Sequence, residues 1–364
     1  MGKVSDLAGW HIPIKDLVDA VGFPTGFGSV GRTRWPDTDD PFVATLKALG
    51  ATVPGKTATS ELGLTAYCEP VGEEPPTNPL WPGMTTGGSS GGAAEAAYTF
   101  PVTHGTDGGG SIRVPAAACG LYGIKLPHNP VGGQPSAHGF LSGSLTDLAT
   151  VTSAVTAALA QEEGHTGSRD GRKPRPGSQP TVGYLTEPLH IDTHVDPVMV
   201  EATRRVAELL GARHVPRPYD YDHFEAFTQV FMRRTTTITG PLTPIGSWLR
   251  EMGRTISDIQ YNQAVTQFMS TAGLVKRLAV DVLITPVLAY DPPPIGFFSA
   301  MSPEEDFWEQ TRWTPWATIA NMTGAAALTI PVPVDGRPPV GVELIAVNCS
   351  VSELFQLAEK IGVT

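Results

Sequence analysis

Apolar residues recur at helical spacing in several stretches of the chain. In the clearest stretch, 144–161, a serine able to cap a helix N-terminus precedes a single apolar face. That face is formed by Leu148, Val151, Val155 and Leu159. The same spacing predicts further helical segments over 41–49, 93–100, 196–212, 223–280 and 350–362.

Short apolar runs bounded by glycine, proline or polar residues predict strands between these helices. They cover 100–107, 181–187, 281–287, 327–332 and 340–347. Because strands and helices alternate along the chain, we expect α/β layers around a mostly buried sheet. The stretch 162–180 is polar, rich in glycine and proline and without apolar period, so it predicts a surface connection. No internal repeat is found.

Composition narrows the possible classes of protein. Of 364 residues, 41% are apolar and 17% are charged, which is typical of a globular chain with a core. The net charge of -11 disfavours a nucleic-acid partner, since such proteins carry a concentrated basic face. Three cysteines cannot all pair, and their spacing fits no zinc site. With no leader-like or membrane-length apolar run, we expect a soluble cytoplasmic protein without a metal.

Two glycine-rich serine loops are the main chemical feature, GGSSGG at 87–92 and GTDGGGSIR at 105–113. Glycine in such numbers indicates backbone that turns sharply or approaches a ligand closely. A lysine lies upstream in HIPIKD. The polar groups Lys15, Ser89 and Ser111 are therefore candidates for one catalytic site.

These residue types suit acyl transfer. A serine hydroxyl needs a base to become a nucleophile, and a lysine can be that base only when it is neutral, which burial favours. A second serine can relay the proton between them. Backbone N–H groups of Gly108, Gly109 and Gly110 could bind the oxyanion that forms on attack.

Other interpretations are open at this point. GGSSGG also fits GxSxG at Ser89 or Ser90, the nucleophile elbow of α/β-hydrolases, although that leaves Lys15 and GTDGGGSIR unexplained. Histidines available to an elbow are His190, His194, His214 and His223. A phosphate loop would need a GK[ST] ending that is absent here, and the SxxK pattern is absent as well. Lys56 and Lys125 are rival bases.

Several other residues have two interpretations each. Cys119 in PAAACG is typical of a small core residue rather than a nucleophile. The tryptophans Trp308, Trp313 and Trp316 could line a pocket or fill the core. Four further histidines are scattered along the sequence, which indicates structural or surface positions rather than metal ligands. They are His11, His104, His128 and His138.

The two serine loops and the upstream lysine together resemble the amidase signature family of serine hydrolases. The resemblance continues through GFPTGFGS, GATVPGKTATSE, TNPLWPGMTTGGSSGG, DVLITPV, TPWATIANMTGAAALTIPV and PPVGVELIAV, in the order that the family shows. It covers nearly the whole chain. It implies a single α/β domain over 1–364, with a central mixed sheet covered by helices on both faces.

The resemblance also implies an activity, the hydrolysis of a non-peptide carboxylic amide to an acid and ammonia or an amine through an acyl-enzyme. Ser111 would be the nucleophile, Ser89 a relay following a cis peptide bond, and Lys15 the base. Three neighbours would support the loops, namely Ser90, Asp107 and Arg113. We expect Asp107 and Arg113 to pair or to bond loop backbone. No cofactor is implied.

The chain departs from the family pattern in two places. Members usually carry several tens of residues before the lysine, so this one resembles an N-terminally short member. The usual GLKPTxGRVS is replaced by GIKLPHNPVGGQ. Two alternatives therefore stay open, an amidotransferase subunit that supplies ammonia to a partner and a non-catalytic protein with the same fold. The expected partner is a small-molecule amide, without nucleic acid or membrane, and a homo-oligomer is possible.

Overall fold

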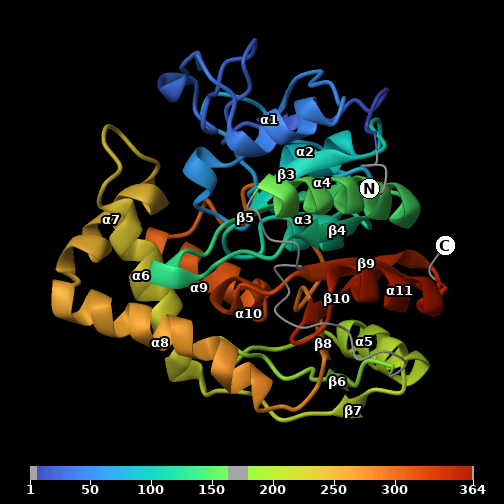
Figure 1. The fold of residues 1–364 in the computed structure, drawn as a ribbon. Coiled ribbons are helices and arrows are strands. Elements are labelled where there is room, and N and C mark those ends of the chain that lie inside the picture. The colour runs from blue at the N-terminus through green and yellow to red at the C-terminus, as the bar shows by residue number, and fades with distance from the viewer. Residues whose placement is uncertain (1–5, 163–178, 363–364) are drawn as a thin grey trace.

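A computed structural model describes residues 6–162 and 179–362. Its main feature is an eight-stranded sheet in the order β3-β5-β4-β9-β10-β8-β6-β7, which crosses the molecule (Figure 1). The strands are β3 Thr103–Asp107, β4 Tyr122–Lys125, β5 Ala137–Ser142, β6 Val182–Tyr184, β7 Arg213–His214, β8 Val282–Pro286, β9 Ala327–Val334 and β10 Arg337–Ala346. Strands from both halves of the sequence therefore share one sheet.

The sheet is mixed. Neighbouring strands from β3 through β8 pair antiparallel, whereas β6 pairs parallel with both β8 and β7. In the central strands, Leu344 of β10 lies opposite Leu328 of β9 and Ile284 of β8. These apolar pairs fix the register, because a slip by one residue would turn each side chain to the other face.

Helices surround the sheet. They are α1 Pro41–Ala48, α2 Gly91–Ala96, α3 Arg113–Ala118, α4 Leu145–Glu162, α5 Pro197–Leu209, α6 Glu225–Thr235, α7 Pro244–Thr255, α8 Asp258–Lys276, α9 Pro303–Trp313, α10 Ile319–Thr323 and α11 Val351–Ile361. Short 3₁₀ helices cover Val30–Arg32, Glu61–Gly63, Val131–Gly133 and Tyr221–Phe224. The helical sequence predicted from about 223 to 280 corresponds to α6, α7 and α8, which lie together at one side of the molecule (Figure 1).

Local sequence explains where several helices begin. The hydroxyl of Ser144 accepts a hydrogen bond from the N–H of Asp147 at 3.2 Å, as the predicted serine cap of α4 requires. Ser350 and Glu353 form a capping box at α11. Pro197 takes the first position of α5, where its missing N–H costs nothing.

Both faces of the sheet are covered. On one face Leu328 and Leu344 belong to a core shared with α4, α5 and α11. On the other, Ala327 and Ile345 pack with Ile319 of α10, and α3 lies against β9 and β10. Side chains of successive strand residues therefore point to opposite faces of the sheet, and both faces are buried. This arrangement confirms the predicted α/β fold with a central mixed sheet between helices.

A small second sheet positions the candidate lysine. Strand β1 Ile14–Lys15 pairs parallel with β2 Lys56–Thr57. The N–H of His104 in β3 donates to the carbonyl of Pro13 at 3.0 Å, so β1 lies beside the edge of the large sheet. Lys15 is consequently held by backbone pairing close to β3, the strand that leads into the second serine loop.

Two further points concern the described residues only. Of the surface connection predicted over 162–180, residues 163–178 lie outside them. No helix in the described ranges is long and apolar enough to cross a membrane.

Candidate active site

Lys15 and Ser89 are in direct contact. Nζ of Lys15 donates to Oγ of Ser89 at 2.7 Å and to the carbonyl of Thr106 at 3.2 Å. The peptide bond between Gly88 and Ser89 is cis, as the resemblance implies for this position. A Cβ on Gly88 would lie 2.2 Å from the carbonyl oxygen of Tyr67, so only glycine fits there.

The lysine amine is buried, and within residues 6–162 and 179–362 it has no carboxylate partner of its own. Burial withdraws the ammonium ion from water and lowers the pKa of Lys15 from 10.5 to about 7, although nearby Asp107 opposes part of this shift. A substantial fraction of the amine is therefore neutral near pH 7, with a lone pair that can accept a proton from Ser89.

Ser111 lies between β3 and α3, at the end of the second glycine loop. Gly110 before it has φ +110°, and a Cβ there would come within 2.8 Å of the Cβ of Ala317. The loop can therefore turn this tightly only with glycine. The two serine loops are joined by Ser90, whose N–H donates to the carbonyl of Ser111 at 3.2 Å and whose hydroxyl donates to that of Thr106 at 3.2 Å.

The backbone N–H groups of the loop differ in their partners. That of Gly110 donates to Asp107 at 2.8 Å, unlike the open oxyanion donor predicted from the sequence. In the described part of the chain, the N–H groups of Gly108, Gly109 and Ser111 have no hydrogen-bond partner. These three are consequently the better candidates to bind an oxyanion.

A buried charged network holds this loop. Arg113 pairs with Asp107 through two bonds, from Nε at 3.0 Å and Nη2 at 2.9 Å, and with Glu343 through Nη1 at 2.7 Å. Asp107 accepts in addition from the N–H of Ile112 at 3.0 Å. Asn321 donates to both the carboxylate and the carbonyl of Asp107, at 2.9 and 3.0 Å. The carboxylate thereby ties the two ends of the loop to the sheet.

The ionisation of the network follows from these bonds. Burial alone would raise the pKa of Asp107, but the Arg113 guanidinium and the Asn321 amide outweigh it and hold that pKa well below the usual value. Burial also raises the pKa of Glu343, with Arg113 opposing the shift. Asp107 is therefore the more firmly ionised of the two carboxyl groups.

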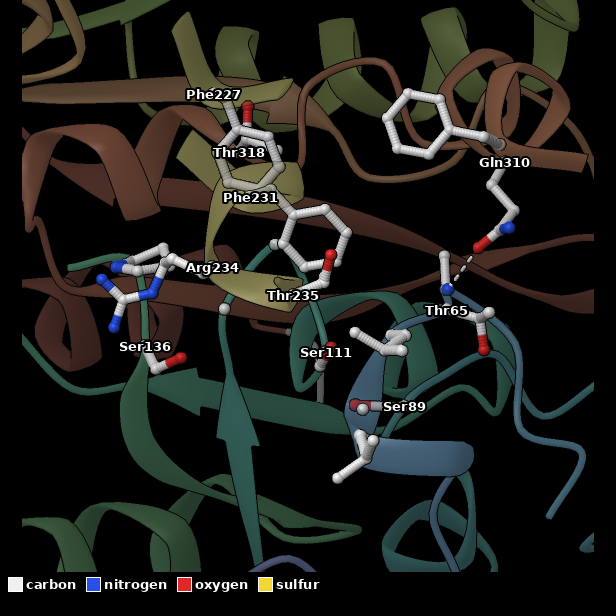
Figure 2. A pocket seen from close by; sticks show the side chains of 18 of the residues that line it. Thr65, Ser89, Ser111, Ser136, Phe227, Phe231, Arg234, Thr235, Gln310 and Thr318 are labelled. Carbon is white, nitrogen blue, oxygen red and sulfur yellow. Dashed lines mark hydrogen bonds between the residues drawn. The ribbon is translucent and has the colours of Figure 1, made fainter. Parts of the chain in front are cut away.

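Ser89 and Ser111 line one cavity of about 250 Å³, which Figure 2 shows from close by. Its walls come from the loop after β2, the two serine loops, α6 and α9. Aromatic side chains line it from two helical regions, Phe224, Phe227 and Phe231 at and before α6 and Phe307 on α9. Small polar groups form much of the rest, among them Thr65, Ser136, Gln310 and Thr318. The cavity is thus mainly apolar, with a few polar groups around the serines.

A family model described as Amidase matches residues 2–240 and 245–354. The chain belongs to the amidase family. A Synechocystis sp. protein named "Putative amidase" is 30% identical to it, over 97% of this chain and 74% of the relative. The 6-aminohexanoate-cyclic-dimer hydrolase of Paenarthrobacter ureafaciens is 28% identical, over 89% of this chain and 76% of the relative.

Solved structures show the same fold. A structure of 6-aminohexanoate cyclic dimer hydrolase superposes with a TM-score of 0.80 at 22% identity, covering 97% of this chain and 84% of that one. The structure of a bacterial aryl acylamidase has a TM-score of 0.74 at 17% identity, covering 98% and 84%. Family membership makes the protein an amidase, a hydrolase of carboxylic amide C–N bonds, and does not favour the two alternatives left open above.

The rival bases of the amidase have other contacts. Lys56 pairs with Asp16 at 3.0 Å. Nζ of Lys125 donates to the carbonyls of Leu126 and Ala325, at 3.2 and 2.7 Å, and lies 3.0 Å from Nδ1 of His128. In the described structure neither amine bonds a serine.

The nucleophile-elbow interpretation is not supported, because no histidine among the described residues forms a hydrogen bond with either serine of GGSSGG. His190 lines the cavity but bonds Thr318 at 2.9 Å, and His223 bonds Thr271 at 2.8 Å. The remaining two histidines contact carboxylates. His194 contacts that of Asp196, and His214 contacts that of Glu187. Within the described residues, Ser89 has a lysine partner instead.

Most of the other residues to which the sequence assigned two interpretations lie in the core. Trp313 and Trp316 are completely buried, and none of the three tryptophans lines the cavity. Cys119 is buried in a small apolar cluster, as predicted. Among the described residues, no group of three His, Cys, Asp or Glu side chains could hold a metal ion.

Sequence reasoning missed Asn321 and Glu343 of the network and the aromatic wall on α6. The signal for Glu343 was present, because a single carboxylate stands in the apolar strand VGVELIAV. A charged residue in a buried strand needs a buried partner. Asn321 lies in TPWATIANMTG, a stretch matched to the family without a role for its amide.

Proposed function

We propose that Ser111 is the nucleophile of this amidase and that Lys15 is the base, acting through Ser89. The observation that carries the proposal is the 2.7 Å contact between Nζ of Lys15 and Oγ of Ser89, whose hydroxyl faces the same cavity as Ser111. The lowered pKa of Lys15, about 7, supports it, since a base must be neutral at working pH.

In the acylation step, Oγ of Ser111 attacks the amide carbonyl carbon. Its proton passes to Oγ of Ser89 while the Ser89 proton passes to Nζ of Lys15. The described structure has no hydrogen bond between the two serines, and such catalytic contacts often tighten only when substrate binds. The C–N bond then breaks, and the proton returns through Ser89 to the leaving nitrogen. The acyl group stays on Ser111 as an ester.

Deacylation uses the same groups in the same order. Water attacks the ester carbonyl and gives a proton to Ser89, with Lys15 again accepting the relayed proton. The C–O bond breaks, the proton returns to Oγ of Ser111, and the acid leaves. In both steps the N–H groups of Gly108, Gly109 and Ser111 would bind the oxyanion. The buried pair of Asp107 and Arg113, the loop anchor, holds the loop that carries these groups.

Replacing Ser111 tests the nucleophile. Ser111→Ala should abolish hydrolysis of hexanamide and labelling by a serine-directed fluorophosphonate, because no acyl-enzyme can form. Ser153→Ala is the control, since Ser153 is exposed on α4 and does not line the cavity. Normal hydrolysis by Ser111→Ala would rule out the proposal.

Replacing Lys15 tests the base. Lys15→Ala should lose at least about 100-fold in kcat/KM at pH 7, the usual contribution of a general base, and should recover some activity as pH rises. Lys47→Ala, which removes a surface lysine paired with Asp39, should keep the wild-type rate. A Lys15→Ala rate within a few-fold of wild type would argue against this role.

We also propose that the amidase works alone on small amides in the reducing cytoplasm, without nucleic acid or membrane partners. Cys68 and Cys119 support this location, because both are buried free thiols. Cell fractionation tests the location. Size-exclusion chromatography with light scattering tests for a homo-oligomer, and dependence of activity on ATP and a second protein would point to an amidotransferase instead.

A further inference from the structure

The cavity that holds the serines has an uneven distribution of charge. Of the described residues that line it, Arg234 alone carries a permanent charge. No carboxylate of a described residue lines the cavity, and burial lowers the pKa of the lining His190 to about 3, which keeps that ring neutral. A substrate therefore meets an apolar cavity with one cation, on a protein whose net charge is -11.

Arg234 has no acidic partner in the described part of the chain. Its Nη2 donates to the neutral amide oxygen of Gln134 at 2.6 Å, and none of the ion pairs between described residues includes it. The preceding residue, Arg233, pairs with Asp258. A guanidinium has five N–H donors, so Arg234 keeps most of them available at an exposed position.

Helix geometry places Arg234 on the cavity side. Phe224, Phe227 and Phe231 line the cavity at intervals of three and four residues, and Arg234 follows at the next interval of three. The rings of Phe227 and Phe231 are stacked with centroids 5.8 Å apart. One face of α6 thus offers a hydrocarbon surface that ends in a cation.

The same face borders the loop before Ser111. A Cβ on Gly109 would lie 3.3 Å from Cζ of Phe227, and one on Gly108 would lie 3.0 Å from Oγ of Ser136. Figure 2 shows Ser136 and Arg234 on the same side of the cavity, away from Gln310 and Thr65. A chain that runs from Ser111 along Phe227 therefore reaches Arg234 and Ser136.

We propose that the preferred substrates are amides that also carry a carboxylate, separated from the amide by a hydrocarbon segment and bound by Arg234. The inference rests on the proposed function, since it names the substrate class of that site. An arginine can bind a carboxylate through two parallel hydrogen bonds, and Ser136 can donate a third. The carboxylate belongs either to the acyl part, as in a monoamide of a dicarboxylic acid, or to the amine part, as in an N-acyl amino acid.

A structural role for Arg234 predicts a different outcome. Basic residues in the last turn of a helix stabilise its C-terminus, and Arg233 and Arg234 both occupy that turn of α6. Such a role would lower thermal stability when Arg234 is replaced, but it would not change the ratio of rates on charged and neutral substrates. The ratio is therefore the decisive quantity.

The test compares matched pairs of amides at low ionic strength. On the acyl side, the monoamide of hexanedioate is compared with hexanamide; on the amine side, N-acetyl-6-aminohexanoate is compared with the same amide lacking its carboxylate. We expect kcat/KM to favour the anion at least about tenfold in one pair, the usual effect of a charge-assisted hydrogen bond. The pair that shows it identifies the part of the substrate that Arg234 binds, and the preference should fall with added salt.

Two variants of Arg234 and one of its neighbour complete the test. Arg234→Gln should reduce the preference to about one, and Arg234→Glu should make an amino-terminated hexanamide better than the anion. Arg233→Gln changes the neighbouring residue on α6 and breaks its pair with Asp258 of α8, and this variant should keep the wild-type preference. Equal rates for wild type on the anionic and neutral members of both pairs, or a preference that survives in Arg234→Gln, would overturn the inference.

Binding to Ser111→Ala separates this inference from the proposed function. Calorimetry with that variant should give a Kd for one of the anionic amides at least about tenfold lower than for its neutral partner. This preference without any turnover by the wild type would support the role of Arg234 and contradict the proposed function. Turnover without the preference would contradict the role of Arg234 alone.

Discussion

The loop anchor around Arg113 gives a sharp prediction about stability. Replacing Arg113 with methionine fills much of the same space but removes four buried hydrogen bonds, two to Asp107, one to Glu343 and one to Asn321. Two carboxyl groups are then left in the interior without their cation. Breaking a buried ion pair in this way costs about 3–5 kcal/mol, a large part of a typical stability of about 5–15 kcal/mol.

The cost should depend on pH. In the wild type the pKa of Asp107 is depressed, so its contribution to stability is present above the unfolded pKa near 3.8 and lost as pH falls through the lower folded value. Without Arg113, the largest influence that opposes burial is removed, so the pKa of both Asp107 and Glu343 should rise. The native state then holds protons that the unfolded state releases, so the variant loses stability as pH rises from about 4 to 7.

Urea denaturation followed by tryptophan fluorescence measures this effect, because Trp313 and Trp316 are fully buried. Arg113→Met should be destabilised more at pH 7 than at pH 5, relative to wild type. Arg312→Met, which removes a partly exposed pair with Glu309, should cost less than about 1 kcal/mol at either pH. A cost for Arg113→Met that is equally small and independent of pH would refute the reasoning.

Two other predictions concern the identity of the base and the glycine before Ser89. Burial lowers the pKa of Lys125 to about 7, as it does for Lys15, yet Lys125→Met should leave the rise of kcat/KM through about pH 7 in place, as a pH profile would show. Gly88→Ala should lower the thermal midpoint and abolish activity, because its Cβ would meet the backbone of Tyr67 at 2.2 Å. A Cβ on Gly143 would meet nothing within 4 Å, so Gly143→Ala should keep the wild-type thermal midpoint and activity. Similar behaviour of the two glycine variants would contradict the packing argument.

Elements with a strong local pattern could be predicted closely from the sequence. The helix expected over 144–161 is α4, with its serine cap, and the strand expected over 281–287 is β8. In contrast, β5 was missed because AHGFLS has no apolar alternation, and its Gly139 allows a close approach of strands instead: a Cβ there would lie 1.9 Å from the carbonyl of Ile124.

The residues of the candidate site also differ in how far the sequence alone could predict them. Lys15, Ser89 and Ser111 belong to short motifs with their own glycines, so their chemistry is visible in the sequence. Arg234 and Phe227 line the cavity only because α6 packs beside the serine loops, a tertiary contact between segments more than 100 residues apart. Single-residue patterns carry no information about such contacts.

The most direct test of the catalytic assignment is the rate of fluorophosphonate labelling as a function of pH, with the modified residue identified by mass spectrometry. The account predicts a single adduct on Ser111, whose rate of formation rises through about pH 7 as Lys15 becomes neutral. Lys15→Met should lose that rise. An adduct on Ser89, or a rise through about pH 7 that persists in Lys15→Met, would contradict the account.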